Sequence, residues 1–211
     1  MKTLTAALLA AFLTQAADAG WTSLFDGKTL DGWEQKNGTA TYRVEDGCIA
    51  GKTTEGSPNS FLCTKKDYGD FELRFEVKVD NELNSGVQIR SRSTPEIDKG
   101  RVHGPQVEIA ASGHSGRVYA EGLKFGWLCP EASDPKAKEA FKKGEWNRYL
   151  VRCEGLSIRT WVNDVPVADF TEDKTGLSTG FIGLQVHGIK KGTGPYEVRW
   201  RNIQLKELSK P

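Results

Sequence analysis

The chain has 211 residues, of which 29 are Lys or Arg and 28 are Asp or Glu, so its formal net charge is +1. A nucleic-acid-binding surface needs an excess of cations to displace counterions from phosphates, and this balance argues against one. Hydrophobic residues make up 37% of the chain and charged residues 27%, which excludes a disordered protein and is typical of a folded one. The length fits a single β-rich domain.

The first residues have the pattern of a secretory signal peptide. Lys2 gives a positive start, Leu4–Leu13 is an apolar stretch too short to span a bilayer, and Ala17-Asp18-Ala19 is a small-x-small cleavage signal. We predict a signal peptide over residues 1–19, cleaved before Gly20, followed by one domain over residues 20–211. No later stretch is apolar enough to span a membrane, so the sequence predicts an exported protein, periplasmic or extracellular.

Export permits disulfides, and the chain has an even number of cysteines: Cys48, Cys63, Cys129 and Cys153. Four cysteines allow three pairings. One pairing joins Cys48 to Cys63 on neighbouring predicted strands and leaves Cys129 for Cys153. Buried free thiols are the alternative, because Cys is common in protein cores.

Apolar residues recur at every second position through most of the chain, which is typical of β-strands. Residues 71–79 (FELRFEVKV) alternate most clearly, as in an antiparallel strand with one solvated face. Further strands are expected over residues 41–45, 48–51, 61–64, 86–92, 106–110, 149–153, 157–162, 181–186 and 196–205, with a hairpin turn at Asn163-Asp164. Only Pro135–Phe141 has a helical pattern. The order predicts an all-β fold, an antiparallel two-sheet jelly-roll sandwich with at most one or two short helices.

Three of these strands carry short polar residues on the face opposite their apolar residues. The polar positions are Gln88, Arg90, Gln106, Glu108, Gln185 and His187. If the apolar residues share one core, the polar set lines the other face, and on a concave sheet it converges. Amide, guanidinium, carboxylate and imidazole groups suit the hydroxyls of a sugar. The alternative is an ordinary solvated sheet face, as on residues 71–79.

Eight short segments follow one another along the predicted domain. They are Trp21–Trp33 (WTSLFDGKTLDGW), Val44–Gly47 (VEDG), Tyr68–Leu73 (YGDFEL), Asn84–Arg90 (NSGVQIR), Gln106–Ile109 (QVEI), Gly144–Asn147 (GEWN), Gly183–Gly188 (GLQVHG) and Trp200–Leu208 (WRNIQLKEL). In this order they resemble the 3-keto-disaccharide hydrolase domain family. The resemblance implies a concanavalin A-like fold, export, and action on sugars with a ketone at C3. Many related lectin-like sandwiches only bind, so the fold alone does not settle the activity.

The resemblance also marks Gln88, Arg90, Glu108 and His187 as the site. The chain departs from the family pattern at Val186, where members often carry an acidic residue. It departs again in the Gly-, His- and aromatic-rich segment 103–130, so the choice of substrate is not carried over.

The implied chemistry starts from a ketone at C3, which acidifies the hydrogen on C2. Its removal gives an enolate that expels the glycosidic oxygen from C1, and water then adds back or the enone leaves as a lyase product. This route needs one base of near-neutral pKa and a positive group near the enolate oxygen, not the paired carboxylates of ordinary glycosidases. His187 fits the base, Glu108 orients it or is itself the base, and Arg90 stabilises the enolate.

The remaining candidates bind rather than react. Gln88, Gln106 and Gln185 are expected to hold sugar hydroxyls, and the aromatic faces of Trp33, Trp127 and Trp161 to stack on sugar rings. No metal is firmly predicted. A divalent cofactor is a competing use of His187 and Glu108, joined by His103 or His114.

Two other functions compete with a carbohydrate-active enzyme. One is a non-catalytic lectin-like module that binds glycan on the same face, and the other is a structural cell-surface or matrix sandwich. For both the enzyme and the lectin-like module, the expected partner is a carbohydrate. No nucleic-acid or protein partner is predicted.

Overall fold

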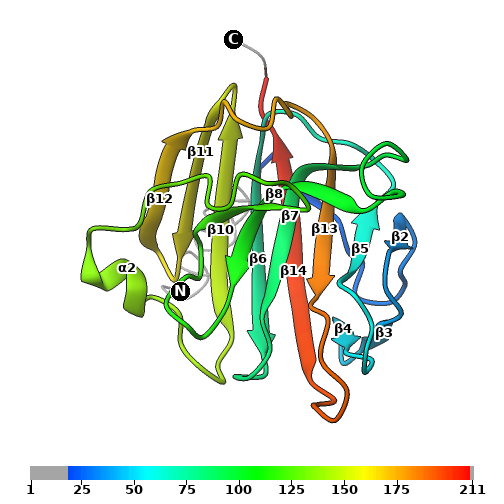
Figure 1. Ribbon diagram of the computed structural model, residues 1–211. Helices are drawn as coiled ribbons and strands as arrows, with labels where there is room; N and C mark the ends of the chain where they lie inside the picture. Colours follow the sequence, from blue (N-terminus) through cyan, green and yellow to red (C-terminus); the bar gives the residue numbers. More distant parts are fainter. Residues whose placement is uncertain (1–18, 210–211) are drawn as a thin grey trace, which may run out of the picture.

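Two antiparallel β-sheets pack face to face in the computed structural model, which describes residues 19–209 (Figure 1). The all-β two-sheet sandwich predicted from the sequence is confirmed. The predicted signal peptide lies outside the described residues except for Ala19. Within residues 19–209, no helix has the length and apolar character needed to cross a bilayer.

The larger sheet has eight strands in the order β12-β11-β10-β6-β14-β4-β3, with β1 added beside β14. Its strands are β1 (Thr22–Ser23), β3 (Thr41–Glu45), β4 (Cys48–Lys52), β6 (Phe71–Val79), β10 (Asn147–Glu154), β11 (Ser157–Val162), β12 (Val165–Thr171) and β14 (Glu197–Glu207). The turn predicted at Asn163-Asp164 joins β11 to β12, and both residues have positive φ, as a tight hairpin requires.

The smaller sheet has six strands in the order β2-β5-β13-β7-β8-β9. These are β2 (Trp33–Lys36), β5 (Ser60–Thr64), β7 (Ser85–Ser93), β8 (Val102–Ile109), β9 (Val118–Glu121) and β13 (Phe181–Val186). The predicted helix is α2 (Pro135–Glu139), which starts where the side chain of Asp134 accepts a hydrogen bond from the amide of Lys136.

The core lies between the sheets and follows the alternation seen in the sequence. On β6 every second residue, from Phe71 to Val79, is buried, while the residues between them reach solvent. Val87, Val107 and Leu184 face these side chains from the smaller sheet. Period-two patterning therefore decides which face of each strand enters the core.

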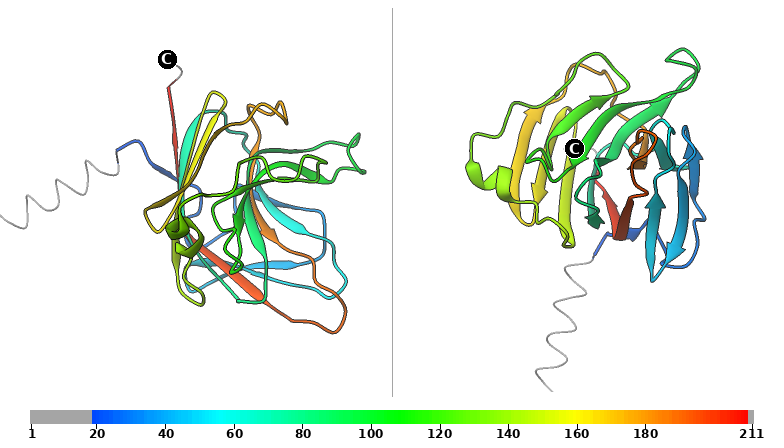
Figure 2. Two further views of the ribbon diagram at one scale, coloured as in Figure 1. Left: turned by 60° about the vertical axis from the view of Figure 1, so that its left-hand side comes forward. Right: turned by 60° about the horizontal axis from the view of Figure 1, so that its bottom comes forward.

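The outer face of the smaller sheet is also covered, so that β7, β8 and β13 are buried at nearly every position. The far end of the β7–β8 hairpin projects beyond the sandwich in Figure 2 (left). Val102 packs on Phe61, Cys63 and Phe181 in a small apolar cluster of its own. The start of β8 thus shelters the part of the face around Phe61 and Phe181.

A local change of backbone lets the hairpin bend. The pairing of β7 with β8 shifts register between Gln88 and Arg92. Gly104 on β8 has φ +135°, and a Cβ there would come within 2.6 Å of Ser91 Oγ. Only glycine tolerates this conformation and approach, so Gly104 sets where β8 turns over the face.

Arg90 lies in the same irregular stretch, with φ +49°, and the expectation that its side chain shares a face with Gln88 is wrong. Its Nη2 is 2.8 Å from Asp70 Oδ1, and Nε and Nη1 donate to the carbonyls of Gly69 and Gly155. These partners lie just before β6 and just after β10, at the end of the larger sheet, and the Arg90 side chain is 2% exposed. The register shift breaks the alternation, so Arg90 links the two sheets instead of lining the outer face.

All four thiols are free and buried, which is the alternative to disulfides that the sequence left open. The proposed partners Cys48 and Cys63 lie on different sheets, β4 and β5. Burial raises the pKa of Cys153 to about 12 and also raises that of Cys63. The protonated thiols act as small apolar side chains in the core.

Replacing Asp70 with Ala should destabilise the fold by about 3 kcal/mol, because it leaves the charge of Arg90 buried without its carboxylate. Urea unfolding followed by tryptophan fluorescence measures the change. The control is Glu131→Ala, which removes the exposed ion pair with Lys138 and should cost less than about 1 kcal/mol. Equal losses in the two variants would contradict a structural role for the buried pair.

Candidate active site on the smaller sheet

Strand register places most of the predicted polar residues on one face. Gln88 on β7 lies opposite Gln106 on β8, and Gly86 lies opposite both Glu108 and Gln185. Gly86 leaves space that the side chain of Gln106 fills, since a Cβ at Gly86 would come within 2.5 Å of Gln106 Cδ. Gln88, Gln106, Glu108 and Gln185 therefore meet on the sheltered outer face.

A chain of hydrogen bonds runs along this face to Glu108. Ser91 Oγ donates to Gln88 Oε1 and Gln88 Nε2 donates to Gln106 Oε1, both at 2.7 Å. Gln106 Nε2 then donates to Glu108 Oε2 at 3.2 Å, and Asn84 Nδ2 donates to Glu108 Oε1. Gln88 and Gln106, which were expected to hold sugar hydroxyls, are thus bonded to one another and fix the carboxylate in place.

Burial raises the pKa of Glu108 above its ordinary value. The hydrogen bonds from Asn84 and Gln106 and the charge of His187 act in the opposite direction, while the charge of Glu121 adds to the increase. A buried carboxyl group with a raised pKa is a candidate for proton transfer.

His187 follows β13 and is held in one tautomer. Its Nδ1 is 2.7 Å from the carbonyl oxygen of Gly188, which only accepts, so Nδ1 carries a hydrogen and, in the neutral ring, Nε2 carries the lone pair. Gly188 is fixed in turn, because its amide donates to Asn59 Oδ1 at 2.8 Å. A Cβ on Gly188 would come within 2.5 Å of the Ser57 carbonyl, so this close packing requires glycine.

A hollow of about 580 Å³ opens beside His187. It is lined by Asn37, Gly38, Pro58, Asn59, Phe61, Asp98, Arg101 and His187. Gln185 on β13 lies directly opposite Phe61 on the neighbouring strand β5. The Gln185 amide is fully buried, and neither its nitrogen nor its oxygen has a hydrogen-bond partner within residues 19–209. An unpaired buried amide costs about 1–3 kcal/mol, and a bound hydroxyl would remove that cost.

Six polar residues that line the hollow or bond to residues of the site were not predicted as site residues: Asn37, Asn59, Asn84, Asp98, Arg101 and Glu121. Arg101 Nη2 is 2.9 Å from Glu121 Oε1, to which Asn59 Nδ2 also donates at 3.5 Å. Asn84 belongs to the NSGVQIR segment, so the resemblance of that segment to the family could have identified it. Arg101 lies at the hairpin end and Glu121 on edge strand β9. The alternation of residues within a strand does not show that two such separate segments meet.

The three tryptophans predicted to stack on sugars lie in three different places. Trp33 is 5% exposed in the core and donates to the Leu24 carbonyl, so it has no face available to a ligand. Trp127 lies edge-on to Tyr119, the residue opposite Gln106 on β9, with the guanidinium of Arg117 over its ring. Trp127 is thus beside the site.

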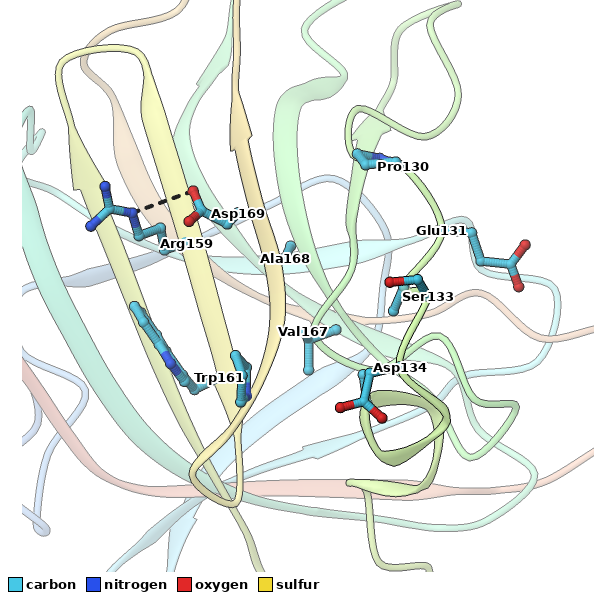
Figure 3. A pocket seen from close by; sticks show the side chains of 12 residues that line it. Pro130, Glu131, Ser133, Asp134, Arg159, Trp161, Val167, Ala168 and Asp169 are labelled. Carbon is cyan, nitrogen blue, oxygen red and sulfur yellow. Dashed lines mark hydrogen bonds and ion pairs between the residues drawn. The ribbon is translucent and has the colours of Figure 1, made fainter.

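Trp161 stands on β11 of the larger sheet, in a separate pocket of about 270 Å³ (Figure 3). Beside it, Arg159 and Asp169 form an ion pair at 3.3 Å. Trp161 is therefore not brought together with Glu108 and His187.

No metal-ligand set is formed by the described part of the chain, in which no three His, Cys, Asp or Glu side chains cluster suitably. His103 Nδ1 donates to the Arg101 carbonyl, and the ring of His114 lies 5.2 Å from that of Trp127. The metal site considered from the sequence, made of Glu108 and His187 with His103 or His114, is therefore not formed within the described residues.

The fold and this face define a lectin-like jelly-roll sandwich with a buried carboxylate and a histidine at a polar hollow. The chain belongs to the 3-keto-alpha-glucoside-1,2-lyase-like domain family, whose model matches residues 20–206. This confirms the resemblance found in the sequence.

Three relatives illustrate the similarity. A 3-keto-disaccharide hydrolase of Bacteroides thetaiotaomicron is 22% identical over 90% of this chain and 79% of its own length. The crystal structure of a candidate glycosyl hydrolase from Parabacteroides distasonis has a TM-score of 0.69 and 21% identity, covering 92% of this chain and 97% of that one. A carbohydrate-binding module from Bacillus subtilis has a TM-score of 0.57 and 17% identity, covering 83% and 96%. The two structures show the fold alone.

The raised pKa of Glu108 predicts a pH-dependent stability. The folded protein binds this proton more tightly than the unfolded chain, so the free energy of unfolding should fall as pH rises from about 4.5 through the raised pKa. Glu108→Gln removes the titration, so its stability relative to wild type should increase over the same range. Urea unfolding between pH 4 and 8 measures this, with the exposed Glu139→Gln on α2 as control. Parallel profiles for wild type and Glu108→Gln would rule out the raised pKa.

Proposed function

We propose that this protein is an exported carbohydrate-active enzyme that cleaves the glycosidic bond of 3-keto-glycosides by removing the proton on C2. The family membership and the named activity of the Bacteroides relative support the substrate class. The observation that carries the proposal is the free Nε2 of His187 at the hollow, close enough to Glu108 for its charge to act on that carboxyl.

In this proposal His187 Nε2 takes the proton from C2, and the C–H electron pair forms the C2–C3 double bond as the C3 oxygen becomes negative. The carbonyl then re-forms, and the C1–O bond breaks with its electron pair leaving on the glycosidic oxygen. Water protonates that oxygen and receives the proton held by His187. Addition of a water molecule across C1 and C2 completes the hydrolysis, and its omission gives the lyase product.

Three groups of the chain assist this reaction by orienting the base, stabilising its charge and binding the sugar. The Gly188 carbonyl keeps Nδ1 protonated, which leaves Nε2 as the base. The carboxylate of Glu108 stabilises the imidazolium as it forms. The Gln185 amide, which has no partner within the described residues, bonds a sugar hydroxyl in this proposal.

A lectin-like module is the second candidate, favoured by the same Gln185 amide and by the fold shared with a carbohydrate-binding module. Such a module binds glycan without turnover, and it should keep its affinity when His187 is replaced.

His187→Ala should lower kcat for a 3-keto-glucoside by about a hundredfold or more, because it removes the base. The pure protein is incubated with paired oxidised and unoxidised disaccharides, and the products are identified by mass spectrometry. His114→Ala is the matched control, since His114 lies against Trp127 and does not line the hollow.

Two outcomes would contradict the proposal. Near-normal turnover by His187→Ala would remove His187 from the reaction. Binding of the disaccharides without any turnover by the wild-type protein would favour the lectin-like module.

A further inference from the structure

The proposed reaction places negative charge on the C3 oxygen, and a fixed cation at that position stabilises it. Arg90 is not available for this role, because its guanidinium is bonded to Asp70 and to two carbonyls at the end of the larger sheet. Among the described residues that line the hollow, Arg101 alone carries a permanent positive charge.

The backbone around Arg101 is fixed from both sides by one side chain. Asn37 Nδ2 donates to the Gly100 carbonyl at 3.1 Å, and Asn37 Oδ1 accepts from the Val102 amide at 2.7 Å. Ser93 Oγ also donates to the Gly100 carbonyl. A single asparagine from the turn after β2 therefore clamps the two peptide groups that flank Arg101, at the end of the hairpin.

The guanidinium is fixed as well, and it shares its partner with the loop of His187. Glu121 Oε1 accepts from Arg101 Nη2 and from Asn59 Nδ2, and Asn59 Oδ1 accepts from the Gly188 amide. A continuous set of hydrogen bonds thus connects Arg101 to the residue after His187. Glu121 is 8% exposed, so the carboxylate that these groups share is shielded from water.

Arg101 keeps donors for a ligand. Within residues 19–209 its Nε and Nη1 make no hydrogen bond, and its side chain is 48% exposed at the hollow. An arginine held in place at one nitrogen loses little further freedom when the remaining donors bind an oxygen.

We infer that Arg101 is a catalytic residue of the proposed reaction and binds the C3 oxygen, with Asn37 and Glu121 as its positioning residues. This inference rests on the proposed function. As His187 takes the C2 proton, the C3 carbonyl pair moves onto oxygen, and Arg101 donates hydrogen bonds to that oxygen without giving up a proton. The charge leaves the oxygen again when the C1–O bond breaks.

The test is steady-state kinetics of Arg101→Gln and Arg101→Lys on a 3-keto-glucoside. Arg101→Gln should lower kcat by about 10²–10³-fold with little change in KM, and Arg101→Lys should recover part of the loss. Added guanidinium chloride at millimolar concentration should raise the rate of Arg101→Gln and leave that of wild type unchanged. The matched control is Arg92→Gln on the same hairpin, which removes the bond to Thr179 and should leave kcat within twofold.

The outcomes separate this inference from the proposed function. If His187→Ala loses activity but Arg101→Gln behaves like Arg92→Gln, the role of Arg101 is overturned and the proposed function stands. A loss confined to KM also overturns it, because Arg101 would then contribute only uniform binding. If the wild-type protein does not turn over 3-keto-glycosides, both fail. Thermal unfolding of Arg101→Gln checks that the variant is folded, and guanidinium rescue cannot arise from a misfolded one.

Discussion

The burial of polar groups on the outer face of the smaller sheet is the constraint on which the site depends. A lectin-like sandwich ordinarily leaves this face in water, where a carboxylate keeps its usual pKa. Here the β7–β8 hairpin bends at Gly104 and packs Val102 over Phe61. Farther along β8, burial raises the pKa of Glu108, and the low dielectric of a buried site strengthens the hydrogen bonds that Asn84 and Gln106 donate to it.

Most of the buried polar side chains described on β7, β8 and β13 satisfy one another, and Gln185 does not. The hydrogen bonds run from Ser91 to Gln88, from Gln88 to Gln106 and from Gln106 to Glu108. Each donor in this chain therefore has its acceptor within the protein. Gln185 lies on the same face with both amide atoms unpaired within the described residues. An unsatisfied buried group of this kind calls for an explanation, and a ligand hydroxyl is the one that the proposed function offers.

Related sandwiches differ in whether they bind or cleave, so the distinction has to lie in particular groups. A binding module needs hydrogen bonds and apolar contacts, which Gln185 and Trp127 can provide. Cleavage through a C3 enolate also needs a base with a free lone pair and a fixed cation. His187 and Arg101 are suited to these parts, and both are anchored through Asn59 and Glu121. A shared anchor sets the distance between base and cation more firmly than two independent loops would.

The sequence by itself determined the sandwich and the face on which Gln88, Gln106, Glu108 and Gln185 lie, because the two-residue period of a strand is a local property. It did not determine the side of Arg90, since one register shift reverses the alternation. The core position of Trp33, the free thiols and the approach of Arg101 to His187 were likewise decided by tertiary structure. These features depend on how the hairpin folds back across the sheet and on contacts between residues far apart in the chain, which no local pattern encodes.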